Sequence, residues 1–280
     1  MTIRPRRSAL FMPASNARAI EKARSLSCDL VILDLEDAVA PDLKPAARDQ
    51  AIAAAGQGGF APRELFVRVN ALDTPWGADD CRAVARAGFA AVVLPKVSHP
   101  ADLAAARALL GDVPLWAMIE TCAGMLDLPA IVASAGANKL EGLLAGTNDL
   151  AKEMRCTPGP ARTPLLGHLA TIVTAAHAYG LTALDGVCNA IDDSAAFAAE
   201  CAQGAMYGFD GKSLIHPAQI AEANRAYGPT AEAVAWAERI IAAFAAPENA
   251  GRGAIRVNGE MVELLHLDQA KRIAALAAAG

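Results

Sequence analysis

The stretch Trp116-Ala117-Met118-Ile119-Glu120 is a short apolar run that ends in a carboxylate, and Leu143-Leu144-Ala145-Gly146-Thr147-Asn148-Asp149 follows the same pattern. Short apolar runs bounded by Pro or Gly are typical of buried strands. Because an unpaired buried charge is costly, both acids need a partner. We interpret Glu120 and Asp149 as ligands of a divalent cation. The alternative is that Glu120 is an acid at a helix N-terminus and Asp149 a helix N-cap.

The composition of the chain excludes several classes of protein. Its 280 residues, 54% of them apolar, are enough for one large α/β domain or two small ones. The net charge of −5 argues against nucleic acid as the main partner. No window is apolar for long enough to cross a bilayer, and we expect no secretory signal. The six cysteines form no C-x-x-C pair and show no zinc spacing with the histidines, so we expect a cytoplasmic protein with reduced thiols.

Eight strands are expected to alternate with helices over the first 210 residues. The expected strands span residues 8–12, 29–35, 65–70, 90–94, a run ending at 120, a run ending near 146, 182–185 and 205–209. Such alternation indicates right-handed βαβ units and a parallel sheet. Eight units over this length favour a closed (β/α)8 barrel, a TIM barrel. An open doubly wound sheet is the alternative, although no G-x-G-x-x-G follows the first strand.

The pattern changes after Pro217, where the alternation of strands and helices stops. We expect helices over 218–226 and 230–245, a linker over 247–251, a hairpin over 255–263 that turns at Asn258-Gly259, and a last helix over 267–278. The last part is too small to fold by itself. We therefore predict a barrel domain over residues 1–246 and a C-terminal hairpin-helix lid over residues 247–280.

Polar residues at the C-terminal ends of the expected strands are candidates for chemistry, because barrel active sites lie there. They are Glu36, Asp37, Arg68, Lys96, Glu120, Asp149, Asp185, Asp210 and Lys212. This carboxylate-rich set suits a hard cation such as Mg²⁺ with a chelating substrate. It contains no Ser–His or Cys–His pair, which argues against covalent acyl transfer. Structural uses stay open, as ion pairs, caps or turn residues, and Lys96 could instead form a Schiff base.

Several motifs in chain order resemble the citrate lyase beta-subunit-like family, within the HpcH/HpaI aldolase group. They are Leu10–Asn16, Val31–Val39, Val67–Asn70, Leu94–Lys96, Ile119–Thr121, Gly146–Leu150 and Gly211–Pro217. The resemblance implies a Mg²⁺-dependent carbon–carbon lyase. Its substrate would be a 3-hydroxyacyl-CoA of the malyl-CoA or citramalyl-CoA type, cleaved to acetyl-CoA and a 2-oxo acid by retro-Claisen chemistry.

The resemblance also implies roles for individual residues. Glu120 and Asp149 would bind the metal, and Arg68 would bind the substrate carboxylate or the oxygen that gains charge. Glu36 and Asp37 would surround metal-bound water. The implied catalytic residues are Arg68, Glu120 and Glu263. The implied substrate-binding residues are Arg68, Glu120, Ser15, Arg18 and Lys96, of which Ser15 and Arg18 would receive the CoA phosphates.

The C-terminal segment carries the one departure from the family pattern. Relatives that act on malyl-CoA and citramalyl-CoA carry an aspartate in a lid supplied by the next subunit, and the matching segment Gly259–Glu263 has Glu263 there. We expect Glu263 to protonate the enolate carbon in a homo-oligomer, a trimer or hexamer. Three alternatives stay open: a thioesterase on the same esters, a non-CoA pyruvate aldolase, and citrate lyase beta-subunit activity on an acyl-carrier-protein thioester.

Overall fold

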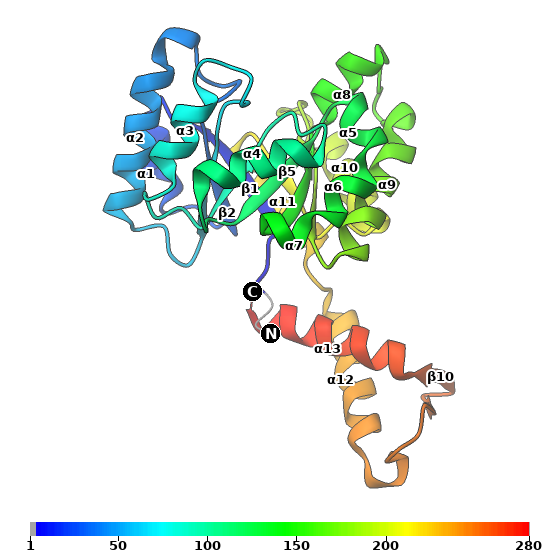
Figure 1. Ribbon diagram of the computed structural model, residues 1–280. Helices are drawn as coiled ribbons and strands as arrows, with labels where there is room; N and C mark the ends of the chain where they lie inside the picture. The colour runs from blue at the N-terminus through cyan, green and yellow to red at the C-terminus, as the bar shows by residue number, and fades with distance from the viewer. Residues whose placement is uncertain (1–3, 280) are drawn as a thin grey trace. The chain divides into compact units, whose positions relative to one another are not determined.

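The computed structural model describes residues 4–279, and residues 6–224 form a closed barrel of eight parallel strands (Figure 1). Neighbouring strands follow the order of the sequence, and the last pairs with the first. The prediction of a (β/α)8 barrel is therefore confirmed. The strands are β1 (Ser8–Pro13), β2 (Leu30–Asp34), β3 (Glu64–Arg68), β4 (Ala91–Leu94), β5 (Leu115–Ile119), β6 (Leu140–Ala145), β7 (Thr182–Asp185) and β8 (Gly211–Leu214).

Helices connect successive strands and surround the barrel (Figure 1). They are α1 (Ala17–Ala23), the 3₁₀ turn η1 (Pro41–Leu43), α2 (Lys44–Gln57), α3 (Gly77–Val84), α4 (Pro100–Leu110), α5 (Cys122–Leu126), α6 (Leu128–Ala133), α7 (Ala135–Asn138), α8 (Thr147–Met154), η2 (Thr163–Leu165), α9 (Leu166–Ala178), α10 (Ser194–Tyr207), η3 (Pro217–Gln219) and α11 (Ile220–Tyr227). Within residues 4–279, no helix is both long and apolar enough to cross a membrane.

The eighth strand lies later in the chain than predicted. Residues 205–209 were expected to form it, but they are the end of α10 and the turn that follows, with Gly208 at a φ of 94°. Over so few residues, an apolar run fits a helix end as well as a strand. Asp210 consequently precedes β8, and its carboxylate accepts a hydrogen bond from the Ala183 amide at 2.9 Å near the N-terminal end of β7. The expectation that Asp210 lies at the active face is wrong.

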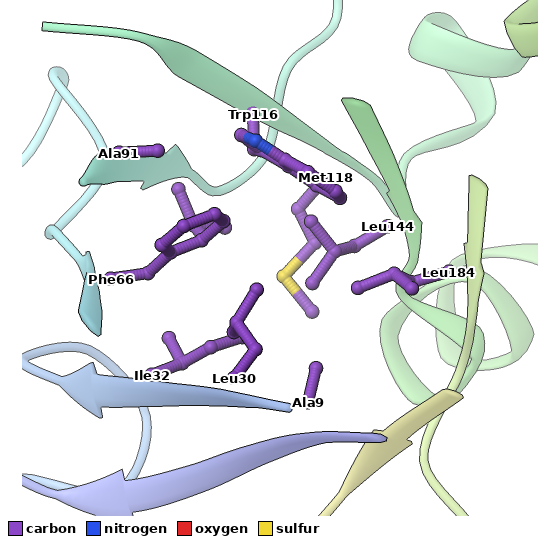
Figure 2. Close-up of a cluster of buried hydrophobic side chains, with 10 residues drawn as sticks. Ala9, Leu30, Ile32, Phe66, Ala91, Trp116, Met118, Leu144 and Leu184 are labelled. Carbon is purple, nitrogen blue, oxygen red and sulfur yellow. The ribbon is translucent and has the colours of Figure 1, made fainter. Parts of the chain in front are cut away.

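Alternate side chains of the strands fill the lumen of the barrel (Figure 2). The buried cluster consists of Ala9, Leu30, Ile32, Phe66, Ala91, Val93, Trp116, Met118, Leu144 and Leu184. Because the side chains of a strand alternate between its two faces, the residue two positions beyond a lumen residue also faces the lumen. This periodicity places Asp34, Arg68 and Glu120 directly above the apolar core, at the C-terminal ends of β2, β3 and β5.

Asp185 and Lys212, also expected at the active face, instead form a buried ion cluster between the strands and α10. The Lys212 ammonium lies 2.9 Å from Asp185 and 2.7 Å from Glu200 of α10, while Arg162 lies 2.7 Å from Asp185. Their neighbours Leu184 and Gly211 are paired in the strands, and Leu184 faces the lumen. Burial alone would raise the pKa of Asp185, but Lys212 and Arg162 outweigh it and keep that pKa below its usual value.

Replacing Lys212 by Met should destabilise the barrel by about 3–5 kcal/mol, because it leaves the Asp185 carboxylate buried without its full set of cations. Urea unfolding followed by circular dichroism measures the change. The control is Lys139→Met, which removes an exposed ion pair with Asp112 and should leave the free energy of unfolding nearly unchanged. Equal effects of the two substitutions would contradict the structural role of the Lys212 cluster.

Residues 225–279, together with residues 4–5, form a second compact unit. Helix α12 (Ala231–Ala245) packs on α13 (Leu264–Ala279), and the hairpin of β9 (Ala254–Val257) and β10 (Glu260–Glu263) follows the 3₁₀ turn η4 (Pro247–Asn249). Its core is made by Ala237, Ile240, Ile255, Val257, Val262 and Ala270. Both Asn258 and Gly259 have positive φ, as a tight hairpin turn requires. The unit begins before residue 247 because α12 belongs to the same core as α13.

Candidate active site

A cavity of about 350 Å³ opens at the C-terminal ends of the barrel strands. Its wall is lined by Phe11, Pro13, Asp34, Asp37, Ala38, Arg68, Met118, Glu120, Ala145, Gly146, Thr147, Asn148, Asp149, Val187, Asn189 and Ile215. Four of the residues selected from the sequence, Asp37, Arg68, Glu120 and Asp149, therefore share one cavity. Barrel enzymes carry their chemistry at this face.

Arg68 is the best-anchored polar side chain of the cavity. Its Nε and Nη2 atoms each donate to a different oxygen of Asp34 at 2.7 Å, and its Nη1 lies 2.8 Å from Glu36 Oε2. The guanidinium also lies over the Phe11 ring, 4.9 Å from its centre. Burial alone would lower the pKa of Arg68, but Asp34 and Glu36 outweigh it and raise that pKa. Arg68 is thus a permanent, oriented cation.

Glu120 and Asp149 meet at the ammonium group of Lys96. The Lys96 Nζ lies 3.5 Å from Glu120 Oε1 and also contacts Asp149 Oδ2, while the Lys96 backbone amide donates to Glu120 Oε1 at 2.8 Å. Gly146 is required beside them, because a Cβ there would lie 2.4 Å from Glu120 Oε2. The two carboxylates therefore converge on one point that accommodates a cation.

Glu120 does not lie in the first turn of a helix, and Asp149 is not a helix N-cap, which were the alternative roles considered for them. The N-cap of α5 is Thr121, whose side chain accepts from the Gly124 amide, and the N-cap of α8 is Gly146. Asp149 lies in the first turn of α8, and Glu120 lies before Thr121, 2% exposed. Within residues 4–279, no group of three or more His, Cys, Asp or Glu side chains is arranged around a single metal position. A cation held by Glu120 and Asp149 would thus complete its coordination with water and substrate.

Glu36 is the carboxyl group whose protonation is most affected by the site. Burial raises its pKa to about 7, against the opposing effect of Arg68, and the neighbouring Asp37 and Glu120 raise it further. Its Oε1 lies 3.9 Å from Lys96 Nζ. Asp37, which is more exposed, lies 3.5 Å from Arg68 Nη1. Of these two acids, Glu36 is therefore the one whose pKa lies near neutrality.

The metal-free protein should lose stability as the pH rises from about 4.5 to about 7. A carboxyl group whose pKa is raised by folding binds its proton more tightly in the native state, so that contribution is present at low pH and lost above the native pKa. We expect Glu36→Gln to remove this dependence, which amounts to about 2–3 kcal/mol. Urea unfolding in EDTA at pH 5 and pH 8 measures it, and parallel pH profiles for wild type and variant would contradict the assignment.

Five of the residues assigned from the sequence lie outside the cavity wall: Glu36 and Lys96, which contact the wall residues Arg68 and Glu120, and Ser15, Arg18 and Glu263. Ser15 and Arg18 are exposed at the start of α1. The N-cap of α1 is Asn16, whose side chain accepts a hydrogen bond from the Ala19 amide. Glu263 ends β10 in the second unit, where its backbone amide donates to His266 Nδ1 at 2.9 Å.

Sequence reasoning missed two features of the site. Asp34 is 1% exposed and accepts hydrogen bonds from Nε and Nη2 of Arg68, but it was taken only as part of a strand. Its position in the strand could have revealed this role. Asp34 lies two residues after Ile32 and four residues after Leu30, and both of those side chains face the lumen. Asn148, in the first turn of α8, and Asn189, in the loop after β7, exchange hydrogen bonds between their side-chain amides at the cavity wall.

The site therefore places two converging carboxylates beside a fixed guanidinium at the C-terminal face of a (β/α)8 barrel. Residues 7–217 match the family model described as HpcH/HpaI aldolase/citrate lyase, and the chain belongs to this family. It is 46% identical to the (3S)-malyl-CoA thioesterase of Cereibacter sphaeroides, covering 98% of this chain and 95% of the relative. It is 34% identical to citrate lyase subunit beta of Escherichia coli, covering 96% and 92%.

Solved structures agree with this family. The CitE protein of Mycobacterium tuberculosis in complex with magnesium, acetoacetate and coenzyme A has a TM-score of 0.75 and 33% identity, covering 96% of this chain and 97% of that chain. A citrate lyase beta subunit from Mycobacterium tuberculosis, in complex with oxaloacetate and magnesium, has a TM-score of 0.70 and 33% identity, covering 82% of this chain and 100% of that chain. A citrate lyase from Burkholderia xenovorans has a TM-score of 0.84 at 21% identity, which bears on the fold alone.

Proposed function

We propose that this protein is a Mg²⁺-dependent enzyme that cleaves a CoA thioester of the malyl type. The observation that carries the proposal is the convergence of Glu120 and Asp149 on one cation position in the cavity that Arg68 lines. The 46% identity to a malyl-CoA thioesterase and the magnesium and coenzyme A in the CitE complex support it. On this proposal the protein acts in the cytoplasm on a small-molecule thioester.

Glu120 and Asp149 fit a magnesium ion as its protein ligands. Both are carboxylates, the preferred ligands of this hard cation, and Gly146, which has no Cβ, lets the Glu120 side chain lie against its backbone. Bound there, the ion would lower the pKa of a substrate hydroxyl and polarise an oxygen atom of the substrate. Lys96 would then give up its contacts with the two acids and remain as a cation at the rim of the cavity.

Arg68 would bind the substrate carboxylate or the thioester oxygen. Its guanidinium is already oriented by Asp34, so little reorganisation is needed when negative charge develops on the substrate. Glu36 and Asp37 would accept hydrogen bonds from water beside it. The apolar wall formed by Phe11, Met118 and Ile215 would exclude other water molecules from the reacting atoms.

Two bonds of such a substrate can be cleaved. Hydrolysis converts malyl-CoA and water to malate and CoA, and the 46% identity to a thioesterase favours this reaction. Retro-Claisen cleavage instead breaks the carbon–carbon bond, giving glyoxylate and acetyl-CoA after the enolate carbon takes up a proton. The family and the fixed cation Arg68 favour this second candidate. Both reactions use the same metal ligands.

Product analysis by mass spectrometry separates the two candidates. The purified protein is incubated with malyl-CoA and, separately, with citramalyl-CoA in Mg²⁺. Free CoA and the hydroxy acid would establish hydrolysis, whereas acetyl-CoA and a 2-oxo acid would establish carbon–carbon cleavage. Turnover of a hydroxy-oxo acid without CoA, or turnover only of an acyl-carrier-protein thioester, would overturn the proposed substrate class.

The C-terminal unit is proposed to act as a lid in a homo-oligomer, with Glu263 as its acid. If carbon–carbon cleavage occurs, Glu263→Gln should lower turnover about 10²-fold or more, because a positioned acid no longer protonates the enolate carbon. Mg²⁺ affinity should stay unchanged. The matched control is Glu260→Gln in the same strand. Equal turnover of both variants and wild type, or a native protein that is monomeric in solution, would contradict the lid.

A further inference from the structure

A buried lysine outside the cavity holds the backbone that carries Glu36. The Lys44 side chain, 7% exposed, donates to the carbonyl oxygens of Leu35 and Glu36, both at 3.0 Å, and to Asn70 Oδ1 at 2.7 Å. These three bonds use all three protons of the ammonium group. The Nζ atom of Lys44 lies over the Trp76 ring, 5.2 Å from the ring centre.

Lys44 occupies a position in its own helix that is unfavourable for a cation. Lys44 is the first residue of α2, and a cation is unfavourable at the positive end of a helix dipole. Desolvation of the ammonium adds to this cost. The stability of α2 therefore does not explain why a lysine is buried here. Its hydrogen bonds to the Leu35 and Glu36 carbonyl oxygens do explain it.

A buried acid, Asp80, holds Asn70 in this network. Asp80 of α3 is 0% exposed, and its Oδ2 accepts from the Asn70 side-chain amide at 2.6 Å and from the Asn70 backbone amide at 3.0 Å. Its Oδ1 accepts from Arg48 Nε at 2.7 Å. The Asn70 amide nitrogen also donates to the Leu35 carbonyl at 3.0 Å. Asn70 is thereby fixed with its oxygen toward Lys44.

The network joins the two chain segments that supply the Arg68 cluster. Leu35 and Glu36 follow β2, which ends in Asp34, and Asn70 lies two residues after Arg68. The Leu35 amide donates to the Arg68 carbonyl at 2.9 Å, so the two segments are also joined directly. A shift of the Leu35–Glu36 backbone would therefore move the Glu36 carboxylate relative to the guanidinium that it contacts.

We propose that Lys44, supported by Asn70 and Asp80, is a positioning residue that fixes the Leu35–Glu36 backbone and so sets the orientation of the Arg68 cluster. Its effect on catalysis rests on the proposed function, whereas its effect on the backbone does not. The residue touches neither the cavity nor the proposed metal ligands. Its removal should thus lower the rate of the chemical step more than the affinity for substrate.

The test is hydrogen exchange of Lys44→Met in the metal-free, substrate-free protein, followed residue by residue. The Glu36 amide, bonded to Asp34 Oδ1 at 3.0 Å, and the Val39 amide, bonded to the Glu36 carbonyl at 3.0 Å, should exchange at least about tenfold faster than in wild type. The control is Arg6→Met, which removes a cation paired with Glu64 at the N-terminal end of β3 and should leave both amides unchanged.

Kinetics with the proposed substrate supply the second readout. In Lys44→Met, kcat should fall at least about tenfold while KM changes less than about threefold, because misorientation acts in the transition state. If Lys44→Met does not fold, Asp80→Asn, which weakens the hold on Asn70, should give the same pattern to a smaller extent. Wild-type exchange at Glu36 and Val39 in a folded variant, or equal acceleration in Arg6→Met, would overturn the proposal.

Discussion

Replacing Glu120 by Ala should abolish Mg²⁺ binding measured by calorimetry and lower turnover by about a thousandfold or more. Glu120 is 2% exposed and its Oε1 is oriented by the Lys96 amide, so its removal deletes one of the two proposed protein ligands. Loss of a pre-oriented charge at the reacting centre typically has an effect of this size. Asp149→Ala should weaken Mg²⁺ binding in the same way.

The barrel should fold normally in both variants, because residues at this face serve function more than stability. The matched control is Glu141→Ala, which removes a half-exposed carboxylate from β6, where it lies 3.7 Å from Arg6. That variant should retain wild-type affinity for Mg²⁺. Wild-type affinity in both Glu120→Ala and Asp149→Ala would show that the metal position is misassigned.

Arg68→Lys should lower kcat/KM by about 10²-fold or more while leaving Mg²⁺ affinity nearly unchanged. The planar guanidinium makes two parallel bonds to Asp34 and a third contact to Glu36, and a point charge on a flexible stem reproduces only one of these. Steady-state kinetics with the CoA ester measures the change.

The chain offers a matched control for this substitution. Arg7 makes the same kind of two-bond pair with Asp29, at 2.8 Å for each bond, before β1 begins. Arg7→Lys should therefore affect stability but not kcat/KM. Unchanged kinetics for Arg68→Lys, or equal losses in the two variants, would make Arg68 a structural residue.

The barrel and the central acids were predictable from local patterns, but the residues around them were not. Apolar runs punctuated by Pro and Gly located seven strands, and the acids selected after two of them, Glu120 and Asp149, share one cavity. The prediction of the eighth strand was wrong because the apolar residues 205–207 end helix α10, and most of the run 205–209 lies at the surface, with Met206 78% exposed. An apolar run of five residues has no period long enough to separate the two structures.

Strand parity explains the remaining differences at the site. Asp185 and Lys212 lie at strand positions whose side chains point away from the lumen, whereas Asp34 lies at a position that faces it. A shift of one residue in the expected strand moves every side chain to the other face. Glu263 lies in the separate C-terminal unit, and its role in an oligomer stays a proposal.

The consumption of malyl-CoA by the wild-type protein tests most directly whether it is a divalent-metal enzyme that acts on a malyl-type CoA ester. The rate is measured in Mg²⁺, after EDTA treatment, and again after Mg²⁺ is restored. The account predicts turnover in Mg²⁺, loss in EDTA and full recovery. Undiminished turnover with all divalent metal removed, or no consumption of the ester in Mg²⁺, would contradict it.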